Sequence, residues 1–255
     1  MSQFSKESYD INGIETVVYT AGSGEPLVFF HGAGTVDGFD FALPLAETFR
    51  VILPYHPGFG ESADDPSVDE MHDYVMHYLE LFDALELKTF NLVGLSLGGY
   101  LAAKFGVEHG HRIRKLGMIA PALMVDPEHP LTDILAMDGQ ELIAALVKNF
   151  DVLAPHLPES PGIDFIADRY RETTSLARIQ WEHPNDLKLP RYLHRLTMPT
   201  MIVWGEEDRI VPVAQAEAWK KALPDVTVTI VPDAGHLVHL EKPEVVTALG
   251  EFLGA

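Results

Sequence analysis

The sequence predicts an α/β fold in which helices cover both faces of a mostly parallel sheet. Short apolar runs alternate along the chain with longer amphipathic segments, which is the pattern expected of such a layered fold. The chain has 255 residues, of which 47% are hydrophobic. This length is sufficient for a large core and still fits a single domain.

Six short segments are predicted to be strands. Five of them are apolar runs rich in β-branched and aromatic residues, as in strands that are buried on both faces. The sixth, 226–231, alternates valine or isoleucine with threonine and is therefore expected at a half-exposed edge of the sheet. The five buried segments are 26–30, 50–53, 89–93, 116–120 and 200–204.

Amphipathic periodicity predicts two helices that pack on this sheet. In the segment 69–85, apolar residues recur at helical spacing on one face, and Ser67 with Glu70 fits a capping box at its start. The second helix follows Pro243, because the first turn of a helix tolerates proline. This last helix is expected to close the domain.

The segment between Pro121 and about Pro190 departs from the alternation. It contains several helical patterns and several prolines but no convincing strand, so we expect a helical cap inserted into the sheet domain. Its helices are predicted at 140–150 and 163–181. The predicted domain boundaries are therefore 1–121 and 191–255 for the core domain and 122–190 for the cap.

Composition argues against several partners and chemistries. The chain carries 18 basic and 38 acidic residues, a net charge of −20, which disfavours nucleic acid and anionic membrane surfaces. It has no cysteine, and therefore no disulfide, thiolate metal site or cysteine nucleophile. The first residues lack the apolar core of a signal peptide, and no apolar run is long enough to span a bilayer. A cytoplasmic protein is expected.

The pentapeptide Gly94-Leu95-Ser96-Leu97-Gly98 carries the strongest chemical signal. It lies between a predicted strand and an apolar helical segment, which is the context that a G-x-S-x-G nucleophile turn requires. A serine at such a turn projects above the sheet, and the N-terminus of the next helix favours developing negative charge. Ser96 is therefore the candidate nucleophile. The alternative interpretation is a glycine-rich turn with a helix-capping serine.

The segment His31-Gly32-Ala33-Gly34, after another predicted strand, is expected to supply part of an oxyanion hole. The backbone N–H of Ala33 would join that of Leu97 in donating two hydrogen bonds to a tetrahedral oxyanion. Flanking glycines allow the backbone to approach a substrate closely. His31 is interpreted as a structural residue that braces this loop, and a plain tight turn is the alternative for the segment.

An acidic loop follows the predicted strand 200–204. An acid at the carboxyl end of that strand can point into the same crevice as Ser96. Glu206 and Glu207 compete for this role, and Asp208 is preferred because an ordered apolar segment follows it.

A histidine follows the last predicted strand. His236 completes the chain order nucleophile, acid, histidine, and is therefore the candidate general base. His239, three residues further on, would suggest a metal site, but no third ligand stands beside the pair. We expect no bound metal.

A nucleotide-dependent oxidoreductase is a rival interpretation, because Gly32-x-Gly34 after a strand imitates a dinucleotide-binding loop. The third glycine of such a loop is absent from its expected place, where Asp37 and then Gly38 stand. The segment 51–57 also does not end in an acidic residue that could bind a ribose. No nucleotide or organic cofactor is therefore expected.

With these motifs in this order, the chain resembles the α/β-hydrolase superfamily, in the capped branch that includes esterases, C–C bond hydrolases and epoxide hydrolases. The resemblance covers nearly the whole chain and is weakest across the cap. It implies an eight-stranded sheet with the cap inserted after the sixth strand. It also implies a triad of Ser96, Asp208 and His236, with the amides of Ala33 and Leu97 as the oxyanion hole.

A further motif, Pro57-Gly58-Phe59-Gly60-Glu61-Ser62, is similar to the family's P-G-x-G-x-S turn. Many members have an aspartate where this chain has Tyr55. This departure affects a loop and leaves the triad intact.

The nucleophile indicates acyl chemistry. Epoxide hydrolases and haloalkane dehalogenases of similar fold place an aspartate where Ser96 stands, so neither reaction is expected. We predict a carboxylesterase that cleaves ester or related acyl bonds of a small, mostly apolar substrate through an acyl-enzyme. Hydrolysis of a carbon–carbon bond, or a slowly turning-over sensor of a small ligand, are the alternatives.

The cap is expected to form the lid and most of the specificity pocket. A small-molecule substrate is the expected partner, and a homo-oligomer is left open. Three arginines, Arg169, Arg171 and Arg178, would suit a substrate carboxylate but are left unassigned, because exposed helix arginines are common. The predicted apolar lining residues are Leu123, Phe165, Trp181 and Val211.

Overall fold

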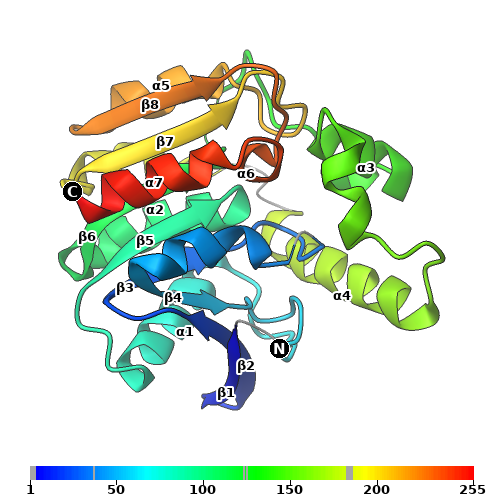
Figure 1. Ribbon diagram of the computed structural model, residues 1–255, viewed down its shortest axis with the longest axis horizontal. Helices are drawn as coiled ribbons and strands as arrows, with labels where there is room; N and C mark the ends of the chain where they lie inside the picture. The colour runs from blue at the N-terminus through cyan, green and yellow to red at the C-terminus, as the bar shows by residue number, and fades with distance from the viewer. Residues whose placement is uncertain (1–3, 37, 123, 125, 182–185) are drawn as a thin grey trace.

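A computed structural model describes residues 4–36, 38–122, 124, 126–181 and 186–255, and these residues form an eight-stranded sheet with helices on both faces (Figure 1). The strand order is β1-β2-β4-β3-β5-β6-β7-β8. β2 pairs antiparallel with both β1 and β4, and all other neighbouring strands are parallel. The predicted fold class is confirmed.

All six predicted strands are present, within a few residues of their expected bounds. β8 lies at one edge of the sheet, and its first four residues alternate in exposure, as their valine and threonine pattern predicts, whereas Ile230 is also exposed. The strands are β1 (Ser5–Ile11), β2 (Ile14–Ala21), β3 (Glu25–Phe30), β4 (Phe49–Pro54), β5 (Phe90–Leu95), β6 (Ile113–Ile119), β7 (Thr200–Gly205) and β8 (Val226–Val231).

The first two strands form a hairpin that sequence analysis did not locate. Ile11 pairs with Ile14, so the loop consists of Asn12 and Gly13 alone. Both loop residues have positive φ, 53° and 91°, which is the backbone that an Asn-Gly hairpin turn requires. The Asn-Gly dipeptide is the sequence signal from which this hairpin could have been predicted.

Each predicted helical segment contains a helix, although the one expected at 140–150 ends at Leu146, because the backbone of Val147 is extended. Those expected at 69–85, 140–150 and 163–181 are α1, α3 and α4, and the helix expected after Pro243 is α7. The α-helices are α1 (Met71–Ala84), α2 (Leu97–His109), α3 (Gly139–Leu146), α4 (Ile163–Gln180), α5 (Gln215–Ala222), α6 (Val238–Glu241) and α7 (Glu244–Gly254). The 3-10 helices are η1 (Asp40–Glu47), η2 (Gly110–Arg112), η3 (Ile134–Ala136), η4 (Phe150–Val152), η5 (Ala154–His156), η6 (Leu189–Arg191) and η7 (Leu193–Arg195).

The start of α1 differs from the expectation. Glu70 is the N-cap residue, and its N–H donates to the Asp73 carboxylate at 2.8 Å. The hydroxyl and the N–H of Ser67 both donate to Asp65 Oδ1, which holds Ser67 in a local turn before the helix. The capping box predicted with Ser67 is therefore wrong.

The two faces of the sheet have separate cores. Alternate residues of a strand point to opposite faces, so Val28 and Phe30 of β3 pack in the core that includes α1 and α2. Leu27 and Phe29 pack in the other core, with η1 and α7. The sheet is thus covered on both faces.

The described residues between β6 and β7 contain helices and no strand. α3 and α4 lie beyond the carboxyl ends of the parallel strands (Figure 1). This placement agrees with a cap, and the domain boundaries at 122 and 190 stay a prediction. No helix among the described residues is both long enough and apolar enough to cross a membrane.

Candidate active site

Ser96 occupies a strained turn between β5 and α2. Its φ of 53° lies in the left-handed region, which costs a non-glycine residue on the order of 1–3 kcal/mol and persists only where neighbouring contacts hold it. Those contacts are backbone hydrogen bonds to the end of β6 and the residues that follow. The N–H of Ser96 donates to the carbonyl of Ile119 at 2.8 Å, and its carbonyl accepts from the N–H of Ala122 at 3.1 Å.

Glycines are required on both sides of this turn. A Cβ at Gly94 would overlap the backbone of Gly98, and a Cβ at Gly98 would overlap the carbonyl oxygens of Phe30 and His31. The G-x-S-x-G pattern therefore reflects close backbone packing between β3, β5 and α2. The close packing holds Ser96 at the carboxyl end of β5.

Asp208 and His236 form a buried pair. His236 Nδ1 lies 2.8 Å from Asp208 Oδ2, and the two side chains are 3% and 0% exposed. The other carboxylate oxygen of Asp208, Oδ1, accepts from the N–H groups of Ile210 at 2.8 Å and Val211 at 2.9 Å. An ionised carboxylate only accepts, so the Nδ1 atom of His236 carries the proton. The lone pair on Nε2 is then the one that can take a proton.

The loops that carry the acid and the histidine are held against each other. A Cβ at Gly205 would overlap the backbone carbonyl oxygens of Ala234 and Gly235. The N–H of Glu207 donates to the carbonyl of Ala234 at 2.9 Å. The N–H of Gly235, next to His236, donates to Glu241 Oε2 at 2.5 Å. These contacts restrain both partners of the pair.

The predicted oxyanion loop lies beside Ser96. A Cβ added at Gly32 would be 3.5 Å from Ser96 Cβ, and Ala33 is the next residue. Leu97 is the first residue of α2, so its N–H has no acceptor within the helix. The two amides thus belong to segments next to Ser96, and their joint action on an oxyanion stays a prediction.

Two buried histidines brace the predicted oxyanion loop. The N–H of His56 donates to His31 Nε2 at 3.0 Å, so His31 carries its proton on Nδ1 and donates to the carbonyl of Gly32 at 2.7 Å. His56 Nε2 in turn donates to the carbonyl of His31 at 2.9 Å, and the Tyr78 hydroxyl donates to His56 Nδ1. The structural role expected for His31 agrees with these contacts.

Both histidines are held neutral. Burial lowers the pKa of His56 to about 3. Burial, followed by the neighbouring His56, lowers the pKa of His31 well below its usual value. Their low pKa values make both histidines poor proton acceptors near neutral pH, which agrees with a bracing role.

Glu172 of α4, which sequence analysis did not single out, contacts the residue directly after the predicted oxyanion loop. Its Oε1 accepts from the Thr35 hydroxyl at 2.6 Å and from the N–H of Gly60 at 2.9 Å. The Arg169 guanidinium contacts both of its oxygens, at 2.6 and 2.9 Å. The buried residues of α4 are Glu172, Ser175 and Leu176, whose helical spacing was the only local signal.

The arginines of α4 bind this protein's own groups. Arg169 pairs with Glu172, Arg171 donates to the carbonyl of Gly60, and Arg178 pairs with Asp64. They fasten α4 to the turn that contains the P-G-F-G-E-S motif. None of the three is therefore presented as a bare cation to a ligand.

The four predicted pocket residues have different environments. Val211 is fully buried, and its contribution to the site is the backbone N–H that binds Asp208. Phe165 is half-buried and packs under the Arg169 guanidinium, 5.5 Å from the ring centroid. Trp181 is 76% exposed at the end of α4. Leu123 lies outside the described residues.

Trp181 lies at a groove, and its role in a substrate pocket stays a prediction. It lines a groove of about 740 Å³ whose other lining residues come from α1, α2, α4 and the segments next to them. Its lining residues do not include Ser96, Asp208 or His236. The position of Trp181 at a helix end leaves its ring in solvent.

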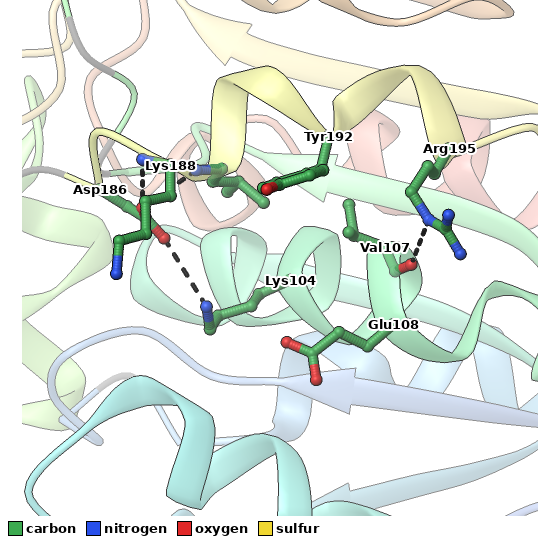
Figure 2. Close-up of a pocket in the computed structure, with 8 residues that line it drawn as sticks. Lys104, Val107, Glu108, Asp186, Lys188, Tyr192 and Arg195 are labelled. Carbon is green, nitrogen blue, oxygen red and sulfur yellow. Dashed lines mark hydrogen bonds and ion pairs between the residues drawn. The ribbon is translucent and has the colours of Figure 1, made fainter.

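A neighbouring pocket of about 370 Å³ lies where α2 faces η6 and η7 (Figure 2). Several of its charged groups have partners within the protein. Lys104 lies 3.7 Å from Asp186, and Arg195 Nε donates to the carbonyl of Val107 at 3.2 Å. This pocket is separate from the loops of the candidate site, and its paired charges identify no ligand.

His239 lies close to His236 in sequence but in a different environment. It is buried, and its ring packs edge-on against Phe41 with the centroids 4.6 Å apart. Within the described parts of the chain, no three histidine, aspartate or glutamate side chains group as metal ligands would.

Comparison with known proteins identifies a family and several similar proteins. The family model described as "Alpha/beta hydrolase family" matches residues 27–249. A 2-hydroxy-6-oxo-6-(2'-aminophenyl)hexa-2,4-dienoic acid hydrolase from Metapseudomonas resinovorans is 26% identical over 95% of this chain and 88% of its own. Lipase 1 from Psychrobacter immobilis is 25% identical over 86% and 73%. A malate-bound thermophilic esterase from Thermogutta terrifontis has a TM-score of 0.79 and 25% identity, covering 98% of both chains.

Proposed function

This chain belongs to the alpha/beta hydrolase family, and we propose that it is a serine hydrolase whose triad is Ser96, His236 and Asp208. The buried pair of Asp208 and His236 carries the proposal, because it leaves His236 Nε2 able to accept a proton. The three residues follow β5, β7 and β8, whose carboxyl ends lie at one edge of the sheet.

The first half of the proposed reaction forms an acyl-enzyme. Ser96 Oγ attacks the substrate carbonyl carbon while His236 Nε2 takes the serine proton. Asp208 holds the imidazole in this tautomer and stabilises the imidazolium that forms. The tetrahedral intermediate then collapses, and the proton passes from Nε2 to the departing alcohol oxygen.

The second half releases the acid. Water attacks the acyl carbon, gives a proton to His236 Nε2, and Ser96 Oγ leaves with that proton. In both halves the backbone N–H groups of Ala33 and Leu97 donate to the developing oxyanion. Loss of one such donor typically costs about 3 kcal/mol of transition-state stabilisation. The sequence of steps needs no metal or organic cofactor.

A small, mostly apolar carboxylic ester, or a related acyl compound, is the proposed substrate. The similarity to a lipase and an esterase supports this choice. A second candidate is cleavage of a carbon–carbon bond, supported by the similarity to a dienoic acid hydrolase. A substrate that carries a carboxylate would need a cationic side chain to bind it. The arginines of α4 are already engaged with Glu172, Gly60 and Asp64. The ester is therefore preferred.

Covalent labelling tests the nucleophile. An alkyl fluorophosphonate presents a tetrahedral phosphorus that an activated serine attacks, so we expect one adduct per chain on Ser96 by intact mass and peptide mapping. The adduct should be absent from Ser96→Ala and His236→Ala. Ser160→Ala, which changes an exposed serine, should label like the wild type. Folded wild-type protein that stays unlabelled at Ser96 would contradict the proposal.

A substrate panel tests the reaction class. Relative rates on p-nitrophenyl acetate and butyrate, thioesters, lactones and a vinylogous diketone should favour the esters. Faster turnover of the diketone would replace the esterase by the carbon–carbon hydrolase. Stoichiometric labelling with very slow turnover of every substrate would instead indicate a sensor.

A further inference from the structure

The carboxylate of Glu172 joins three segments that are far apart in the sequence. Oε1 accepts from the hydroxyl of Thr35, the residue directly after the His31-Gly32-Ala33-Gly34 loop, and from the N–H of Gly60. The Thr35 hydroxyl also accepts from Arg169 Nη2 at 3.1 Å. Thr35 therefore ties the oxyanion loop to α4 through both members of an ion pair.

Burial makes these bonds more restrictive than those of a surface ion pair. The Glu172 side chain is 3% exposed, so its charge depends on the donors that surround it rather than on water. Arg169, whose side chain is 28% exposed, neutralises it. Moving Thr35 away would remove a charge-assisted hydrogen bond from a buried carboxylate, so α4 and the loop hold each other in place.

We propose that Glu172 is a positioning residue: its hydrogen bond with Thr35 fixes the position of the oxyanion loop. This inference rests on the proposed function. Thr35 is two residues from Ala33, whose N–H must lie within hydrogen-bond distance of the oxyanion rather than of the ground-state carbonyl. A displacement of Thr35 would therefore weaken binding of the transition state more than binding of the substrate. Because Glu172 belongs to α4 of the predicted cap, the oxyanion hole would be assembled only when the cap is in this position.

The kinetic test removes the hydroxyl of Thr35. Thr35→Val keeps the shape and deletes both hydrogen bonds, and should lower kcat on p-nitrophenyl butyrate roughly tenfold with KM nearly unchanged, less than full loss of an oxyanion donor. Thr35→Ser restores the hydroxyl and should recover most of kcat. Thr174→Val, the same change at an exposed position of α4 that bonds only the carbonyl of Tyr170, should match the wild type.

A double-mutant cycle assigns the effect to Glu172. Glu172→Gln removes the charge and keeps an acceptor, and should lower kcat several-fold. Because both changes act through one contact, the two substitutions together should cost clearly less than the product of their separate effects. Independent, multiplicative effects would overturn the proposal.

Amide hydrogen–deuterium exchange provides a readout that does not need catalysis. Peptides covering residues 31–36 should exchange faster in Thr35→Val and Glu172→Gln than in the wild type and Thr174→Val. Unchanged exchange in this segment, or faster exchange with an unchanged kcat, would refute the positioning role. If the wild type failed to hydrolyse esters while the exchange results held, the proposed function would be at fault and the contact between Glu172 and the loop would stand.

Discussion

Replacing Asp208 by asparagine should reverse the tautomer of His236 while leaving the fold in place. Oδ1 of Asp208 accepts from two backbone N–H groups, those of Ile210 and Val211. The amide oxygen of the asparagine must take this position, because its NH2 group would face two donors there. The NH2 group then points at His236 Nδ1, which has to accept. The imidazole proton moves to Nε2, the atom that must take the proton of Ser96.

The size of the effect follows from this tautomer. In serine protease triads the same substitution lowers kcat by about 10⁴. A loss of that size corresponds to about 5.4 kcal/mol of activation free energy. The side-chain volume and the two backbone hydrogen bonds are retained, so we expect the thermal midpoint to change little.

The assay is the steady-state hydrolysis of p-nitrophenyl butyrate by Asp208→Asn and wild type, with thermal midpoints measured in parallel. Glu207→Gln is the matched control, because Glu207 is the neighbouring acid, is partly exposed and pairs with Lys148. Its kcat should stay within about twofold of the wild type, as for surface substitutions in general. If Asp208→Asn kept more than a tenth of the wild-type kcat, the tautomer argument would be refuted.

Three further predictions concern packing, pH and the choice of base. Gly98→Ala should lower the free energy of unfolding in urea by about 1–3 kcal/mol, because its Cβ overlaps the carbonyl oxygen of Phe30; an unchanged midpoint would contradict the packing argument. His56 has a pKa of about 3 in the folded protein, so the unfolded state binds more protons between about pH 6.5 and 3 and stability falls as the pH is lowered. His56→Gln should therefore reduce the slope of unfolding free energy against pH in this window by up to about 1.4 kcal/mol per pH unit, and an identical slope would exclude this linkage. His236→Ala should lower kcat by several orders of magnitude with little change in thermal midpoint, whereas His239→Ala should mainly lower that midpoint; the opposite pattern would exchange their roles.

Local constraints explain which elements could be predicted. The buried strands β3, β5 and β7 are largely apolar runs. A strand that is covered on both faces needs apolar residues at successive positions, so such a run predicts it without knowledge of its neighbours. β1 has no such pattern. Most of its residues are exposed, so the strand depends mainly on its pairing with β2, with Ile11 buried at its end.

The pocket residues could not be assigned in the same way. Trp181 and Val211 are both apolar, yet one is exposed at the end of α4 and the other is buried next to Asp208. Helical or strand spacing gives the face on which a side chain lies. Which neighbour covers that face depends on how distant segments pack, which short-range patterns do not contain.

The sequence by itself determined the family-level features of this protein: a strand, turn and helix around Ser96, and an acid and a histidine after later strands. Each depends on residues only a few positions apart, since turn geometry and strand burial are local requirements. Only the tertiary structure decided which groups support them. Glu172 reaches Thr35 across 137 positions and Gly60 across 112, and His56 reaches His31 across 25. Such contacts arise because a buried polar group must find a partner wherever the packed chain supplies one.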